Sequence, residues 1–258
     1  MELSRNVFRA GWVVLLGGFL AAAGGCAMVA ASRPDIDPAA RREIERMCAA
    51  VGGLDRYRMT VESITDERLP SGQLVQVGRT SEIRVARPDR MALTVANDSG
   101  GRWAGWLSGG ILVLLDEVGH RVARVELPGS VDEAIEELGR RYGLDLPLAD
   151  IVSGLRRADL LTRVQTGLYL GTGLAAGVEC HHVLFRQPVV DWQAWIAAGE
   201  PALPRRILLT FKDEPDLPVY EATITEWDVS PPFDEETWKP RLPADARHVT
   251  IEDLLEGE

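Results

Sequence analysis

Lysine is scarce in this chain of 258 residues, and its positive charges do not cluster. Only two lysines occur, Lys212 and Lys239, and the formal net charge is -11. The arginines are scattered apart from doublets such as Arg41-Arg42. Proteins that bind nucleic acid draw much of their affinity from clustered cations that release counterions from phosphates. The composition therefore excludes nucleic acid as an expected partner.

The common motifs of metal and nucleophilic sites are also missing. The chain has four histidines and three cysteines, and it contains no HExxH, no CxxC and no G-x-S-x-G. Without them, neither a zinc site nor a serine nucleophile on a strained turn is indicated. No metal and no cofactor is expected, and a hydrolase ranks third among the functions that we consider.

One stretch does gather reactive side chains: VECHHVLFRQPVVDWQAWI, residues 178–196. Its apolar residues and flanking turn residues predict a strand, in which neighbouring side chains point to opposite faces. His181 and His182 then cannot reach one metal together, and Cys180 shares a face with His182 only. Asp191 could orient either histidine across a hairpin, but no nucleophile accompanies the pair. We expect both histidines to be structural.

The N-terminus is typical of an exported protein. Arg5 and Arg9 are followed by an uncharged, largely apolar run over residues 10–32, as in a secretion signal. Three interpretations remain open: a lipoprotein signal that leaves Cys26 lipidated, cleavage near Ala31, or a retained membrane anchor. In each of them the chain from about residue 33 lies outside the cytoplasm. We expect an envelope or periplasmic protein that is tethered to a membrane through its N-terminus.

The remaining cysteines allow two states. If Cys26 is lipidated or removed, Cys48 and Cys180 are left in an oxidising compartment, where a disulfide can form. The alternative is two buried free thiols, because cysteine packs well as a small apolar residue.

The chain from residue 33 to residue 258 is predicted to be one α+β domain with an acidic C-terminal tail. A helix ending at Gly52-Gly53 is followed by period-two strands from Tyr57 onward. Ser130 and Glu133 have the spacing of a capping box for a helix that ends at Tyr142-Gly143. Strands return after Gln165. This order predicts a long antiparallel meander in a strongly curved sheet, with helices over one face.

The connection between Pro147 and Leu161 is unusually apolar for a surface segment. Burying such side chains yields about 25 cal/mol per Å² of apolar area. We therefore predict that this segment is a lid over the concave face of the sheet. Its apolar residues, which are the candidate cavity and lid residues, are Leu148, Ile151, Val152, Leu155, Leu160 and Leu161.

The order of several motifs resembles a family of predicted bacterial periplasmic proteins. The motifs are RPDRM, PGSVDEAIEELGRRYGLDLPLADI, YLGTGLAAGVECHHVLFRQPVVDWQAWI, GEPALPRRILLTFKD and ITEWDVSP, between about Ile44 and Pro243. The most specific residues are Asp191, Trp192, Gln193, Trp195 and Pro204.

That family is similar in fold to the lipoprotein-handling proteins LolA, LolB and RseB. The resemblance implies a LolA-like half-barrel whose helices cover the concave face, and it supplies no catalytic residue. It favours non-enzymatic binding of a hydrophobic ligand, either a lipid or the acyl chain of a lipoprotein. The alternative is an RseB-like module that binds or senses a protein partner.

Overall fold

The computed structural model describes residues 34–144, 148–154 and 160–256. The export segment with Cys26, and also Pro147 and Leu155 of the predicted lid, lie outside these ranges. None of the described helices has both the length and the apolar character needed to cross a membrane.

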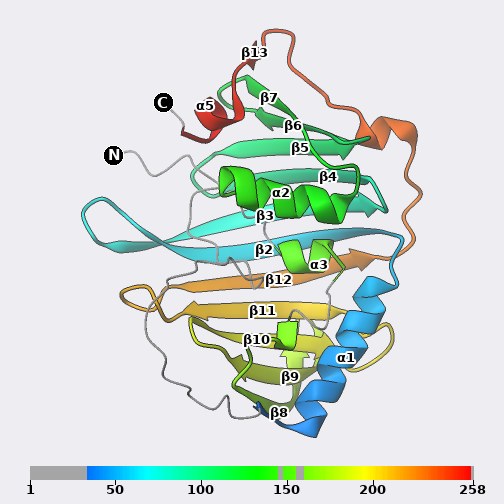
Figure 1. The fold of residues 1–258 in the computed structure, drawn as a ribbon, viewed down its shortest axis with the longest axis vertical. Coiled ribbons are helices and arrows are strands. Elements are labelled where there is room, and N and C mark those ends of the chain that lie inside the picture. The colour runs from blue at the N-terminus through cyan, green and yellow to red at the C-terminus, as the bar shows by residue number, and fades with distance from the viewer. Residues whose placement is uncertain (1–33, 145–147, 155–159, 257–258) are drawn as a thin grey trace, which may run out of the picture.

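Two antiparallel meanders join side by side into one open sheet of thirteen strands (Figure 1). One meander runs from β2 to β7 and the other from β8 to β12, and β12 pairs with β2 between them. In spatial order the strands are β1 (Asp35–Ile36), β8 (Thr166–Ala175), β9 (Val178–Arg186), β10 (Val190–Ala197), β11 (Pro204–Phe211), β12 (Val219–Asp228), β2 (Arg56–Arg68), β3 (Leu74–Ala86), β4 (Arg90–Asn97), β5 (Arg102–Ser108), β6 (Ile111–Asp116), β7 (Arg121–Glu126) and β13 (Arg247–His248).

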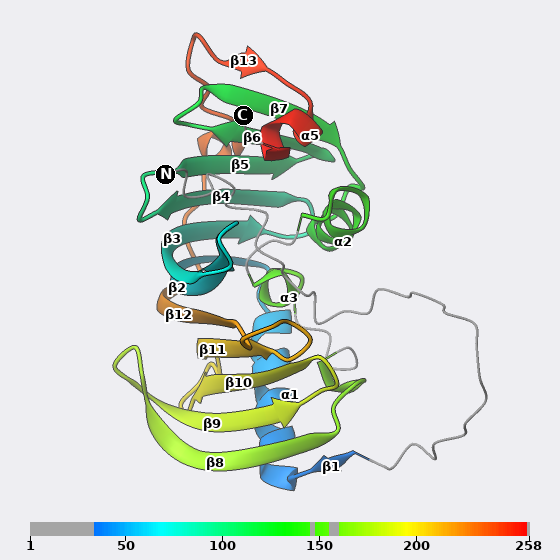
Figure 2. The same ribbon diagram turned by 90° about the vertical axis from the view of Figure 1, so that its left-hand side faces the viewer.

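The predicted antiparallel meander is confirmed except at the two edges. β1 pairs with β8 and β13 pairs with β7 in parallel, so the sheet is mixed. The sheet remains open between these edges. Figure 2 shows β8 and β9 bowing strongly along their length.

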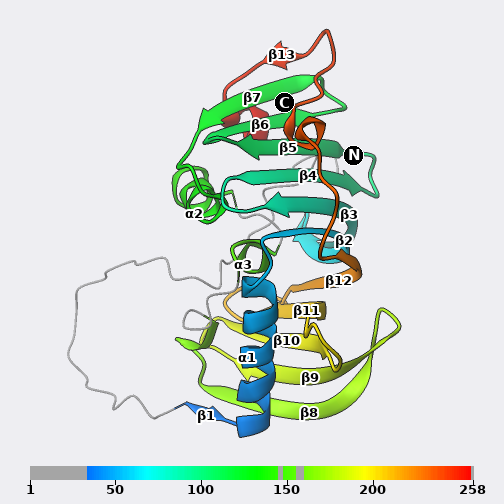
Figure 3. The same ribbon diagram turned by 90° about the vertical axis from the view of Figure 1, so that its right-hand side faces the viewer.

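Helices α1, α2 and α3 lie on the same face of the sheet, which we name the helix face (Figures 1 and 3). The opposite face is named the outer face. On β2, burial alternates in step with the pleat: Tyr57, Met59 and Val61 are buried on the helix face, whereas Arg58, Thr60 and Glu62 point to the outer face. The main core lies between the helix face and the helices. Whether this face is the concave one stays a prediction.

Helix α1 (Pro38–Gly52) and helix α2 (Val131–Tyr142) form where the sequence predicts them. The carboxylate of Asp37 accepts the Ala39 amide at 2.7 Å and starts α1. The Ser130 hydroxyl accepts the Glu133 amide at 3.2 Å and donates to the Glu133 carboxylate at 2.6 Å. Gly143 ends α2 with a φ of 61°, a conformation that suits glycine.

The acidic C-terminal segment after β12 contains short elements of secondary structure and buried apolar residues. It contains a 3₁₀ turn, η1 (Glu235–Trp238), then β13, and then α5 (Ile251–Glu256). On the outer face, Ala246 packs against a second apolar cluster on β5, β6 and β7. Beyond β13, Ile251 and Leu254 are buried in the main core. The segment therefore passes around the β7 edge of the sheet and covers apolar surface on both faces.

Candidate functional site

The described part of the predicted lid belongs to the core. Ile151, Val152 and Leu160 are buried, and Leu148 and Leu161 pack against the same cluster while partly exposed. The described residues 148–154 include the short helix α3 (Ala149–Val152). Its apolar composition is therefore explained by burial against the helix face.

Long-range contacts hold α3 in place, because the helix has little local support. Its N-cap residue is Leu148, whose φ of 54° is left-handed, and no side chain caps its N-terminus. Such a conformation costs about 1–3 kcal/mol for a residue other than glycine. The Val152 carbonyl accepts hydrogen bonds from Arg87 Nη2 at 2.6 Å and from Tyr57 Oη at 3.4 Å. Arg87 Nη1 also donates to Asp132 of α2 at 2.7 Å, so one arginine joins both helices to the sheet.

The space between α2 and the sheet is filled by side chains. A void of about 10 Å³ remains there, roughly enough for one water molecule. All seven residues that line it are apolar or glycine: Met91, Leu93, Gly105, Leu112, Leu114, Leu138 and Leu144. This part of the helix face is thus a closed apolar layer in which a ligand would have to displace side chains.

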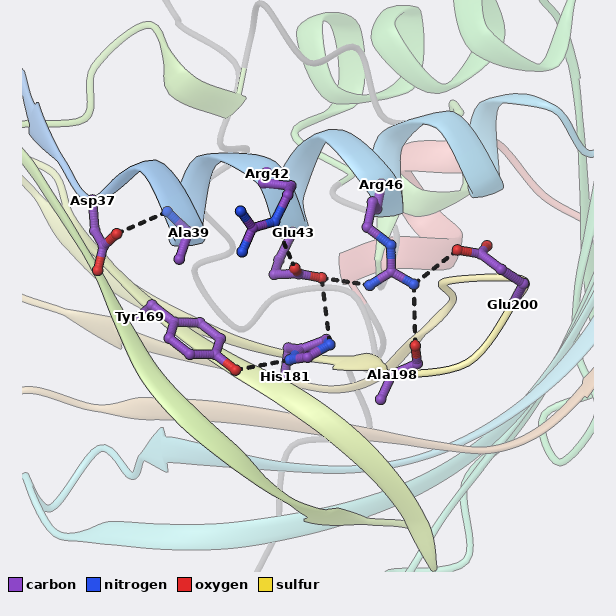
Figure 4. A network of polar contacts seen from close by, with 9 residues as sticks. All are labelled: Asp37, Ala39, Arg42, Glu43, Arg46, Tyr169, His181, Ala198 and Glu200. Atoms are coloured by element: carbon purple, nitrogen blue, oxygen red, sulfur yellow. Dashed lines mark hydrogen bonds and ion pairs between the residues drawn. The ribbon is translucent and has the colours of Figure 1, made fainter.

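A polar network joins α1 to β8, to β9 and to the connection between β10 and β11 (Figure 4). Its centre is Glu43, whose side chain is only 4% exposed. The Glu43 carboxylate accepts a hydrogen bond from Arg46 Nη1 at 2.5 Å and lies 3.8 Å from His181 Nε2. His181 Nδ1 in turn lies 2.9 Å from the hydroxyl of Tyr169.

Arg46 extends the network to the connection between β10 and β11. Its Nη2 donates to Glu200 at 2.8 Å and to the carbonyl of Ala198 at 3.2 Å. The hydrogen bond from Arg46 lowers the pKa of the Glu200 carboxyl. One feature of the sequence could have indicated this network. Glu43 falls between Ala40 and Met47 on the apolar side of α1, where a charge needs a partner.

The two histidines face opposite sides of β9. His181 faces α1, and His182 lies on the outer face, where its ring stacks on Trp195 with 4.0 Å between centroids. His182 Nε2 is 2.9 Å from Gln193 Oε1. The Arg206 guanidinium lies 4.6 Å from the Trp195 ring centre. Among the described residues, no group of three or more metal-ligating side chains comes together.

The family-motif residues divide between the two faces of β10. Trp192 is buried on the helix face and stacks on Phe185 at 4.4 Å. Asp191 carries an ion pair with Lys212 at 2.7 Å. Gln193 and Trp195 belong to the outer-face stack, and the Pro204 carbonyl accepts from the Trp227 indole at 2.9 Å.

Cys48 and Cys180 are both buried, and they do not form the disulfide that the sequence allows. Cys48 belongs to the core between α1 and the sheet, whereas Cys180 alternates on β9 with His181 and so points to the outer face. The sheet separates them. Burial raises the pKa of the Cys180 thiol, which disfavours the reactive thiolate.

These observations define a class: an α+β protein with a large open sheet, an apolar layer under helices on one face, and no cluster of three or more metal-ligating side chains among the described residues. Residues 40–252 match the model of a family described as predicted periplasmic protein, DUF2092. The chain belongs to this family. No curated protein sequence is significantly similar to it.

Similar solved structures include lipoprotein LppX of Mycobacterium tuberculosis, with 16% identity over 75% of this chain and 100% of LppX, at a TM-score of 0.46. They also include MucB, with 12% identity over 80% of this chain and 64% of MucB, at 0.48. A LolA superfamily protein from Nitrosomonas europaea has 9% identity over 78% of this chain and 97% of its own length, at 0.39. At these identities and scores the likeness assigns no ligand to this chain.

Proposed function

We propose that this protein binds a hydrophobic ligand, a lipid or a lipoprotein acyl chain, on its helix face and without catalysis. The observation that carries the proposal is the apolar layer beneath α2, α3 and residues 160–164. Sites for hydrophobic ligands are lined mainly by apolar side chains with few polar groups. Export of the chain, with Cys26 as a lipid anchor, would place this layer in the cell envelope.

Entry of a ligand requires a part of this layer to open, because the void under α2 measures only about 10 Å³. Helix α3 is the element best suited to open. It is one turn long, has no side-chain cap at its N-terminus, and is preceded by a leucine with a left-handed φ. Elements with few local stabilising contacts open at a lower free energy than core strands do. We infer that α3 moves away from the sheet when a ligand enters.

The experiment is binding of a fluorescent long-chain fatty acid to the purified full chain. The test variant is Leu148→Asp, since aspartate tolerates the left-handed conformation of this position but removes an apolar contact with the layer. We expect the Kd to rise about tenfold, the equivalent of about 1.4 kcal/mol. Leu242→Asp, at a leucine that is 42% exposed in the C-terminal segment, is the matched control.

Hydrogen exchange provides the second measurement. Amides of residues 149–153 should exchange before those of β2 and β12, and their exchange should slow when the fatty acid is bound. The proposal fails if the probe does not bind, or if both variants bind it like the wild type and exchange at α3 is unchanged.

A further inference from the structure

The outer face carries a groove that the proposed lipid site does not use. It crosses β12, β2, β3 and β4 and has a volume of about 430 Å³. The residues that line it are Glu221 and Thr223 of β12, Glu62, Ser63 and Ile64 of β2, Gly78, Arg79 and Thr80 of β3, and Ala96, Asn97 and Asp98 at the end of β4.

The hollow results from the sizes of side chains in two neighbouring rows of the sheet. In one row, Glu62 on β2 is followed by the smaller Thr80 on β3 and Ala96 on β4. In the next row, Ile64 is followed by Gly78. A Cβ at Gly78 would lie 3.1 Å from Asp98 Oδ2, so a larger residue there would press on the Asp98 carboxylate. Long side chains on β2 thus stand beside a floor of small ones.

The groove is acidic. Glu62, Asp98 and Glu221 all line it, and the Asp98 carboxylate is fixed at its wall by the Gly78 amide at 2.8 Å. Arg79 also lines the groove, but its guanidinium bonds to Thr65 and Glu67. The alternation of side chains along β2 places these two partners on the helix face. The positive charge of Arg79 therefore lies on the opposite face from the groove. Within the described ranges, no cation pairs with Glu62.

The family-motif stack supports one edge of this groove. Trp195 lies against His182 on one side and against the Arg206 guanidinium on the other. Arg206 Nη2 donates to the Glu221 carboxylate at 2.8 Å. The Trp195 ring therefore packs against the arginine that bonds to one of the lining carboxylates. Arg206 compensates only one of the three lining carboxylates.

We propose that this groove binds the basic side chains of an extended segment of a partner protein. Glu62 and Asp98 complement a positive charge, and Ile64, 46% exposed, offers apolar surface to the aliphatic stem of a lysine or arginine. Glu62, Ile64, Thr80, Ala96 and Asp98 are all exposed, so the groove is open and admits a chain that continues beyond it. The net charge of -11 attracts such a partner from a distance.

The test uses a fluorescein-labelled peptide of alternating lysine and glycine, titrated with the full chain at physiological ionic strength. Glu62→Gln should raise the Kd about three- to fivefold, as expected for one exposed charge pair. Glu126→Gln, an exposed glutamate on β7, changes the net charge equally and should leave the Kd unchanged. Ala96→Trp, at an exposed position, should abolish binding by filling the groove.

Other outcomes would overturn the proposal. Equal weakening in Glu62→Gln and Glu126→Gln would mean general attraction to an acidic protein. Equal competition by spermidine, at matched charge, would assign the groove to small polyamines instead of a protein segment. An Ala96→Trp variant that melts like the wild type and still binds the peptide would exclude the groove. The fatty-acid assay is independent of all three results, so failure of one proposal leaves the other standing.

Discussion

Replacing Arg46 should destabilise the fold more than its partly exposed position suggests. Arg46 is the closest cation to the Glu43 carboxylate, which is buried between α1 and the sheet. Arg46→Met keeps most of the aliphatic stem and removes the charge. The variant leaves Glu43 as a buried anion without its main partner.

The expected cost follows from the remaining contacts. Breaking a buried ion pair from one side costs about 3–5 kcal/mol. Arg42 Nε stays 3.4 Å from the carboxylate, although its own side chain is 65% exposed. We therefore expect a loss of about 2–3 kcal/mol, which lowers the Tm of a domain of this size by about 5–10 °C.

The assay is chemical denaturation followed by tryptophan fluorescence, with two controls. Glu200→Gln removes the second ion pair of Arg46. Because the Glu200 side chain is 75% exposed, the free energy of unfolding should fall by less than about 1 kcal/mol. The double variant Glu43→Leu with Arg46→Met removes both charges and should be more stable than Arg46→Met alone. The buried-charge reasoning is wrong if the double variant loses as much free energy of unfolding as Glu43→Leu and Arg46→Met lose separately, added together.

Three further predictions concern the N-terminus, the histidine stack and the lid. A labelled fatty acid should mark the wild type in cells but not Cys26→Ser, and equal labelling would remove the lipoprotein interpretation. His182→Gln should lower the free energy of unfolding by about 0.5–1.5 kcal/mol, because the stacking on Trp195 is lost. Elemental analysis should show the same metal content in both proteins. Stoichiometric zinc that is lost in the variant would contradict the structural role of His182. Arg87→Met should speed hydrogen exchange at residues 149–153 at least tenfold, because the Val152 carbonyl and the Asp132 carboxylate lose their shared donor. The control variant Arg84→Met should leave this exchange unchanged. Equal exchange rates in the two variants would show that Arg87 does not hold α3 to the sheet.

The elements with a clear period were predictable from the sequence. Ser130 at the start of α2 and the glycines at the ends of α1 and α2 mark helix boundaries, and the structure places the helices there. The opposite orientation of His181 and His182 follows from the pleat alone. Local geometry fixes such features, so a single sequence suffices to read them.

Features that depend on distant segments were not predictable. The edge strands β1 and β13 have two residues each, which is too short to show a period. In the acidic C-terminal segment, Ile251 and Leu254 are buried in the main core, most of whose other residues lie far away in the sequence. The sequence left the state of Cys48 and Cys180 open between a disulfide and two buried thiols, because spacing along the chain does not tell on which face of the sheet each cysteine lies.

The two faces of the sheet differ in chemistry, and this difference lets the two proposals be separated within one protein. The helix face between α2 and β4–β6 is lined by apolar side chains and glycine, whereas the outer-face groove is lined by three carboxylates. Alternation along β2 carries this division, with Val61 on one face and Glu62 on the other. Leu148→Asp should weaken the fatty acid and spare the lysine peptide, and Ala96→Trp should do the reverse. If each variant weakens both ligands, the faces are coupled through the sheet, and binding on one side would then regulate the other.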